Sequence, residues 1–230
     1  MQKIYFLSGT MCNQDLWQFV FPKIEKYTPE YIDITSATSF DEINTVILSK
    51  ITSPAILVGF SLGGFSALNF ATQYPEKIKK LIIISANSKG LSDDELRLRK
   101  STIKFLETHA YKGVSTTRVK QFLHPDNHQN KIVIRIIKKM DTNLGKEVLI
   151  KQLKATSTRI DITSHLNKII SPILLIGADQ DKLISYKDLS HLKEQFKNIQ
   201  SIQIKNCGHM IPLEKPLEMV GVINNYLNDY

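Results

Sequence analysis

A serine flanked by glycines stands between an apolar run and a helix-like segment. Residues 59–64 read GFSLGG, after AILV at 55–58 and before FSALNFATQY at 65–74. A serine in such a place often only caps the following helix. Glycines two residues to either side of Ser61 instead fit a tight strand-to-helix turn, which exposes the hydroxyl at the carboxyl edge of a sheet. With a strand before it and a helix after it, the pattern predicts a nucleophilic serine.

A serine hydroxyl is a poor nucleophile at neutral pH, so it needs a base and the base needs an orienting carboxylate. His209 lies in NCGHMIPLEKP, after the last expected strand, and Asp179 and Asp181 lie in GADQDKLIS, after the preceding one. The order serine, acid, histidine is the one expected with this turn. We expect these groups to meet at one sheet edge. The simpler interpretations are a loop cap for Asp179 and a hydrogen-bonded loop histidine for His209.

The elements that must position these groups alternate along the chain. Short apolar runs are separated by helix-like segments, which predicts an α/β fold with a mostly parallel sheet of about six strands and helices on both faces. The expected strands are residues 3–9, 30–34, 54–60, 79–85, 172–178 and 201–206.

The alternation breaks between residues 89 and 165, where basic amphipathic segments replace the strands. Ser92 followed by Glu95 is a capping-box pattern that opens a helix. A second helix is expected around residues 131–140, with apolar residues on one face and basic residues on the other; the apolar set is Ile132, Val133, Ile136, Ile137 and Met140. We therefore expect a helical lid at 89–165, inserted between core segments 1–88 and 166–230.

The order and spacing of these motifs resemble the α/β-hydrolase fold superfamily over essentially the whole chain, and within it a small esterase-like branch with a helical lid. The matching segments are the first loop LSGTMCNQDLW, the turn GFSLGG, the acid loop GADQDKLIS and the histidine loop CGHMIPLEKP. The resemblance implies Ser61 as nucleophile, His209 as general base and Asp181 as acid. Asp181 is preferred over Asp179 because DKLIS resembles the family's acid segment, although Ser185 replaces its usual proline.

The resemblance also implies an oxyanion hole made by the backbone amides of Thr10 and Leu62. Family members commonly read His-Gly before the first of these donors, where this chain reads Ser8-Gly9. Since the donor is a backbone group, the change need not abolish it. The chain begins at what resembles the family's third strand, so the fold is expected to lack the first two.

The bulk composition fits one compact α/β domain. The chain has 230 residues, of which 42% are hydrophobic and 23% charged, and no apolar segment is long enough to span a bilayer. The amino terminus lacks the features of a signal peptide. The two cysteines, Cys12 and Cys207, suit a reducing compartment and are expected as small buried hydrophobic residues. These features predict a cytoplasmic protein.

The net charge of +8 suggests an acidic partner, although a general enrichment of the chain in Lys, Ile and Asn is the simpler explanation of that charge. Nucleic acid is disfavoured, because the basic residues are spread along the chain without aromatic interleaving or a recognised module. An acidic carrier of the substrate, such as acyl carrier protein, stays open. HPDNH places His124, Asp126 and His128 at a spacing that could suit a metal, but an exposed turn is the simpler interpretation, and neither metal nor organic cofactor is expected.

These observations together predict a serine hydrolase that cleaves a carboxylic ester or thioester through an acyl-enzyme. The same fold and triad also serve acyltransferases, aminopeptidases, carbon-carbon bond hydrolases and lyases, because function lives in the site and not in the fold. A ligand-binding module that retains a triad is the alternative from another class.

Overall fold

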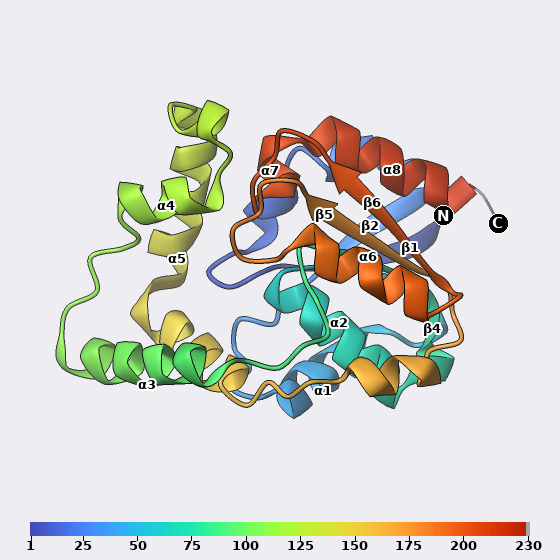
Figure 1. The fold of residues 1–230 in the computed structure, drawn as a ribbon, viewed down its shortest axis with the longest axis horizontal. Helices are drawn as coiled ribbons and strands as arrows, with labels where there is room; N and C mark the ends of the chain where they lie inside the picture. The colour runs from blue at the N-terminus through green and yellow to red at the C-terminus, as the bar shows by residue number, and fades with distance from the viewer. Residues whose placement is uncertain (229–230) are drawn as a thin grey trace.

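The computed structural model describes residues 1–228, and its centre is a six-stranded sheet in which every pair of neighbouring strands is parallel. The strand order is β2-β1-β3-β4-β5-β6 (Figure 1). The prediction of a parallel sheet of about six strands is confirmed. The strands are β1 (Gln2–Leu7), β2 (Tyr27–Ile32), β3 (Ala55–Phe60), β4 (Ile78–Ile84), β5 (Ile173–Ala178) and β6 (Ile199–Ile204).

Two strands, β2 and β6, lie further toward the amino terminus than expected; for β6 the expected range was 201–206 and the strand is Ile199–Ile204. We predicted a strand at residues 30–34, whereas β2 is Tyr27–Ile32 and includes Pro29. β2 is an edge strand that pairs only with β1, so a proline without a backbone N–H is tolerated there. The strand therefore extends through Pro29 to begin at Tyr27, before the first residue that we predicted.

Helices follow the strands and cover both faces of the sheet (Figure 1). The α-helices are α1 (Phe40–Lys50), α2 (Leu62–Gln73), α3 (Asp93–Thr108), α4 (Thr116–Phe122), α5 (Lys131–Thr156), α6 (Tyr186–Gln195), α7 (Ile211–Glu214) and α8 (Pro216–Asn228). Short 3-10 helices lie between them: η1 (Gln14–Trp17), η2 (Phe21–Lys23), η3 (Pro75–Lys77), η4 (Pro125–Asn127) and η5 (Thr163–Lys168).

Successive residues of the central strand β3 enter two different hydrophobic cores. Val58 and Phe60 belong to the core that includes η1 and α8, whereas Leu57 belongs to the core that includes α1 and α2. Because side chains alternate across a strand, a strand covered on both faces is apolar throughout. Burial of each such side chain stabilises the fold by about 1.5–3 kcal/mol.

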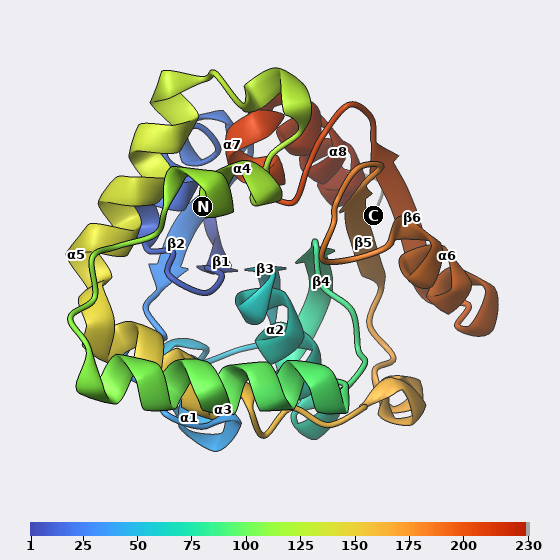
Figure 2. The same cartoon turned by 60° about the vertical axis from the view of Figure 1, so that its left-hand side comes forward.

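Helices α3, α4 and α5 lie between β4 and β5 in the chain and are grouped beside the sheet (Figure 2). The Ser92–Glu95 capping box opens α3 as expected. α5 is longer than the segment we identified, and Gly145, with φ of 71°, interrupts its helical geometry. We also placed Ile132 on the buried face of α5, but its side chain is exposed. The division into core and lid stays our interpretation.

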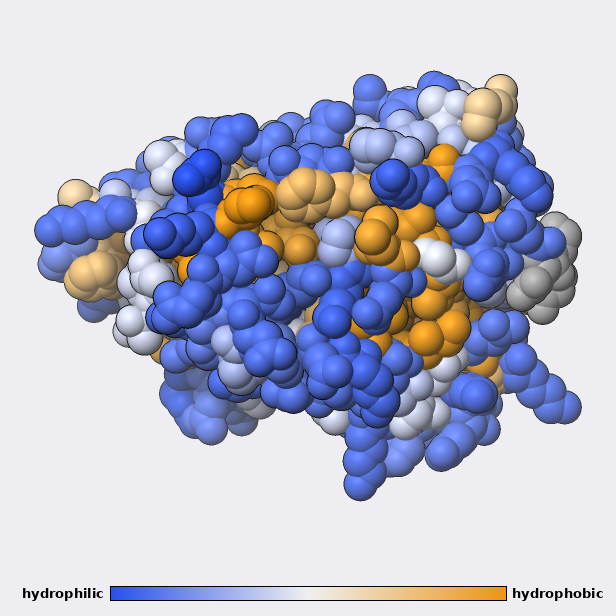
Figure 3. Space-filling view, turned by 90° about the horizontal axis from the view of Figure 1, so that it is seen from above, coloured by the Kyte–Doolittle hydropathy of each residue, from blue (hydrophilic) through white to orange (hydrophobic). Residues whose placement is uncertain are grey.

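Helix α5 packs onto the rest of the chain through one apolar face. Val133, Ile137 and Met140 of α5 are buried in the same core as Trp17 of η1. Seen from above, the molecule is mostly hydrophilic, with apolar residues visible between polar ones (Figure 3). No helix within residues 1–228 combines the length and apolar character needed to cross a membrane.

Candidate active site

Ser61 occupies a strained turn between β3 and α2. Its φ is 52° and ψ is −114°, a conformation that costs about 1–3 kcal/mol for a residue with a side chain. The flanking glycines are required by space: a Cβ at Gly59 would lie 2.3 Å from the carbonyl oxygen of Gly63, and one at Gly63 would lie 2.4 Å from that of Leu7. The turn is anchored by the Ser61 amide, which donates to the Ile84 oxygen at 2.9 Å.

The structure brings together three of the side chains that the sequence analysis singled out. The Nε2 atom of His209 lies 3.1 Å from the Ser61 hydroxyl, and its Nδ1 atom lies 2.8 Å from Oδ2 of Asp181. A carboxylate only accepts hydrogen bonds, so Nδ1 carries the proton and Nε2 is left to accept from the serine. The Asp181 side chain is fully buried. Ser61, Asp181 and His209 follow β3, β5 and β6, respectively.

Asp179 lies outside this chain of hydrogen bonds. Its carboxylate accepts the backbone amides of Asn206 and Cys207 at 3.1 and 3.2 Å. Partial burial opposes ionisation, but these two bonds, together with the charge of Lys205 and the amide of Asp179 itself, lower the pKa of Asp179. Asp181 uses its other oxygen to accept the amide of Leu183 at 2.8 Å. The two acids thus have different contacts: Asp179 hydrogen-bonds the backbone of the loop before His209, and Asp181 hydrogen-bonds the imidazole.

The main chain of His209 is held from two sides. Its amide donates to the carbonyl oxygen of Phe122 at 2.7 Å, and its carbonyl oxygen accepts the hydroxyl of Ser85 at 3.1 Å. The ring centroid lies 5.1 Å from that of Phe60. Since Phe122 is the last residue of α4, the expected lid contacts the histidine loop directly.

The sequence analysis missed Glu214, which joins the same two segments. Its carboxylate accepts the amide of His124 at 2.7 Å, the side-chain amide of Asn127 at 3.0 Å and the amide of Gly208 at 3.1 Å. Burial raises the pKa of Glu214 in spite of these hydrogen bonds. The available signal was an acid five residues after His209 in an otherwise apolar segment.

The two amides expected to form the oxyanion hole belong to loops at the same sheet edge. Leu62 is the first residue of α2, where a backbone amide has no partner within the helix. Thr10 is in a turn closed by the Cys12 amide, which donates to the Gly9 oxygen at 3.1 Å. Within residues 1–228 neither the Thr10 nor the Leu62 amide donates a hydrogen bond.

The remaining candidate residues, the two cysteines and those of the HPDNH segment, are in surroundings that favour a structural role over a catalytic or metal-binding one. Cys12 and Cys207 are buried, and burial raises the pKa of both thiols, that of Cys12 to about 12, so neither is a ready thiolate. In HPDNH, Nδ1 of His124 accepts the Asp126 amide at 3.2 Å. That contact caps η4, so the segment is a turn as expected, but His124 itself is buried and not exposed.

The comparisons with known proteins agree with this architecture. A family model described as alpha/beta hydrolase fold matches residues 21–216. One curated relative, the pimeloyl-[acyl-carrier protein] methyl ester esterase of Wigglesworthia glossinidia brevipalpis, is 28% identical over 199 residues, which cover 84% of this chain and 77% of that protein. A protein of the same name from Neisseria meningitidis (serogroup A, strain Z2491) is 23% identical over 91% of this chain and 71% of its own.

Solved structures share the fold at low sequence identity. An esterase from Thermogutta terrifontis superimposes with a TM-score of 0.89 at 16% identity, covering 99% of this chain and 89% of that one. MenH from S. aureus superimposes with a TM-score of 0.80 at 20% identity, covering 99% of this chain and 94% of that one. The predicted fold family is confirmed, and the prediction of an enzyme that acts on ester bonds agrees with relatives named as esterases.

Proposed function

Because the chain belongs to the alpha/beta hydrolase fold family, we propose that it is a serine hydrolase that cleaves a carboxylic ester or thioester. The observation that carries the proposal is the position of His209, whose two ring nitrogens contact Ser61 and Asp181 at 3.1 and 2.8 Å. That arrangement can take a proton from the hydroxyl while the carboxylate stabilises the charge that develops on the ring.

In the first half of the reaction, the Ser61 oxygen attacks the carbonyl carbon of the ester and its proton passes to Nε2 of His209. The tetrahedral intermediate collapses as the imidazolium gives that proton to the leaving alcohol or thiol. Asp181 keeps the proton on Nδ1 throughout. The product of this half is an acyl-enzyme on Ser61, and no cofactor takes part.

In the second half, His209 activates a water molecule that attacks the acyl-enzyme and releases the acid. Both halves place negative charge on the former carbonyl oxygen, and the Thr10 and Leu62 amides are the proposed donors to it. A donor of this kind typically contributes about 3–4 kcal/mol of barrier lowering. Loop geometry around Thr10 therefore contributes to the rate in addition to the triad.

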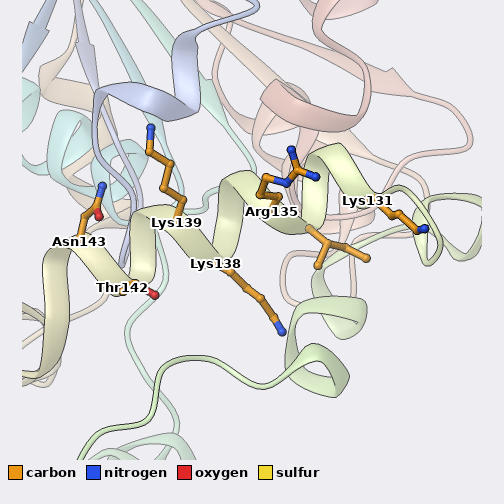
Figure 4. Close-up of a pocket in the computed structure, with 7 residues that line it drawn as sticks. Lys131, Arg135, Lys138, Lys139, Thr142 and Asn143 are labelled. Carbon is orange, nitrogen blue, oxygen red and sulfur yellow. The ribbon is translucent and has the colours of Figure 1, made fainter.

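We further propose that the substrate is attached to an acyl carrier protein. Two relatives carry that carrier in their names, and the outer face of α5 presents Lys131, Arg135, Lys138 and Lys139 (Figure 4). Lys139 pairs with Asp15 at 2.9 Å, whereas the exposed Lys131 and Arg135 have no ion-pair partner in the described part of the chain. Unpaired cations on the lid would attract an acidic carrier toward the site.

Hydrolysis of nitrophenyl esters of increasing chain length by purified protein tests the core proposal. We expect saturable turnover that Ser61→Ala lowers by about 10⁴-fold or more. Ser49→Ala, which removes an exposed hydroxyl on α1, is the matched control and should leave the rate unchanged. Folded wild-type protein without turnover would favour a ligand-binding module, and Ser61→Ala protein with more than a tenth of the wild-type rate would exclude the assigned nucleophile.

A further inference from the structure

One side chain of the lid reaches the loop that carries the proposed oxyanion donor. Gln152 lies on α5, its side chain is 2% exposed, and its Oε1 atom accepts the backbone amide of Met11 at 2.9 Å. An amide N–H can only donate, so the oxygen of Gln152 and not its nitrogen must face Met11. The contact links positions 141 residues apart in the chain.

The Thr10–Met11 peptide lies in the middle of the turn closed between Gly9 and Cys12. Met11 has φ of 55°, the left-handed value that the third residue of a type II turn requires and that glycine normally supplies. A residue with a side chain holds this conformation only when its surroundings fix it. Without such restraint, the central peptide can rotate toward the type I form, in which that φ is negative.

Both ends of that central peptide are held. The Met11 N–H donates to Gln152, and the Thr10 carbonyl oxygen accepts the thiol of Cys12 at 3.5 Å. Thiols are weak donors, so the bond to Gln152 is the stronger restraint. The Thr10 amide belongs to the adjoining Gly9–Thr10 peptide, which meets the central peptide at the Thr10 Cα, and it donates to no protein acceptor within residues 1–228.

We propose that Gln152 is a positioning residue for the oxyanion site: its side-chain oxygen fixes the Thr10–Met11 peptide and thereby holds in place the adjoining Gly9–Thr10 peptide, whose Thr10 amide faces the substrate. The inference rests on the proposed function, because it assigns Thr10 as a donor. It makes the lid helix α5 part of the catalytic geometry.

The other atom of the same amide has no partner within the protein. Nε2 of Gln152 is buried and has no hydrogen-bond partner among residues 1–228. Buried donors in folded proteins nearly always have a partner, and a bound water molecule is the simplest group that would supply it.

Gln152→Met tests the inference, because methionine has a similar length and no hydrogen-bonding amide. We expect kcat per active site, counted by fluorophosphonate titration, to fall about ten- to a hundredfold with little change in KM, as for partial loss of an oxyanion donor. Affinity for a trifluoromethyl ketone, which forms a tetrahedral adduct with the serine, should fall by the same factor. Lys151→Met, an exposed neighbour on α5, is the control and should change neither quantity.

A purely structural role gives a different result. It would lower the fraction of titratable sites while leaving kcat per site and ketone affinity at wild-type values, and that result would overturn the inference. If the Met variant does not fold, Gln152→Glu keeps an oxygen within reach of Met11 and replaces the Nε2 donor with a second, ionisable oxygen; a fall in its kcat per site beyond a hundredfold would contradict the role of the oxygen. Ester hydrolysis by Ser61→Ala would instead remove the proposed function itself, so the two failures are distinguishable.

Discussion

The backbone amide of His209 donates a 2.7 Å hydrogen bond to the carbonyl oxygen of Phe122, so the proposed general base is anchored to the end of α4. A Cβ at the preceding residue, Gly208, would lie 2.6 Å from the His124 nitrogen, which shows how closely the two segments approach. Together with the contact between Gln152 and Met11, this bond makes α4 and α5 a support for the proposed site.

Removal of the Glu214 carboxylate should loosen this support. Glu214→Ala leaves three donors without their acceptor, those of His124, Asn127 and Gly208. Each buried unsatisfied donor costs about 1–3 kcal/mol, less where water can enter. We expect the free energy of unfolding, measured in urea, to fall by about 2–4 kcal/mol and kcat to fall as His209 loses its fixed position. Glu218→Ala, an exposed acid on α8, is the control, and equal effects of the two variants would contradict the bracing role.

The stability of the wild-type protein should carry a pH dependence from the same residue. Burial raises the pKa of Glu214 in the folded state, so between the ordinary and the raised pKa the folded protein binds more protons than the unfolded chain. Wild-type stability therefore falls as pH rises through that window. The side chain in Glu214→Gln cannot titrate, so the variant lacks this decrease in the free energy of unfolding. We expect the free energy of unfolding of Glu214→Gln, measured in urea between pH 4 and 8, to increase relative to that of the wild-type protein as the pH rises. A relative decrease would contradict the raised pKa.

Substitution of Asp181 should lower kcat far more than substitution of Asp179. Asp181→Asn leaves an amide against Nδ1 of His209 and favours the wrong tautomer, so we expect kcat to fall by about 10⁴-fold. Asp179→Asn weakens only the bonds to the Asn206 and Cys207 amides, so kcat should stay within about tenfold of wild type. Nitrophenyl ester hydrolysis at neutral pH provides the comparison. A larger loss in the Asp179 variant would reverse the assignment.

The basic residues on the outside of α5 should affect the KM of carrier-linked substrates and not that of free esters. We expect the double variant Lys131→Glu and Arg135→Glu to raise KM for an acyl-carrier-linked ester by about tenfold or more at low salt, with a smaller effect at high salt. The same variant should hydrolyse a free nitrophenyl ester normally. Lys193→Glu, an exposed cation on α6, is the matched control. If the double variant and the wild-type protein had equal KM values for the carrier-linked ester, the proposal of an acyl carrier protein would be wrong, whereas the proposal of a serine hydrolase would be unaffected.

Much of the site could be predicted because its residues directly follow apolar strands. Ser61 and His209 stand in motifs whose local sequence fixes a turn or loop at a strand end, and parallel strands bring those ends to one edge. The choice between Asp179 and Asp181 could not be made from the residues themselves. Both lie in the same loop, and only the fold determines which carboxylate meets the imidazole.

The supporting residues could not be predicted, for a physical reason. Glu214 accepts an amide 90 residues away and Gln152 one 141 residues away, and no local pattern marks such partners. The expectation for Ile132 was wrong for a related reason: its position fits the apolar periodicity of α5, but its side chain is 61% exposed. Helical periodicity defines a face, whereas tertiary packing determines how wide a face is buried.

The most direct test of the central claim is mass spectrometry of the protein after reaction with a fluorophosphonate. The account predicts one phosphonyl group per chain, located on the peptide that contains Ser61, with labelling abolished in Ser61→Ala and slowed by orders of magnitude in His209→Ala. Labelling at another residue, or equal labelling of Ser61 with and without the imidazole, would contradict it.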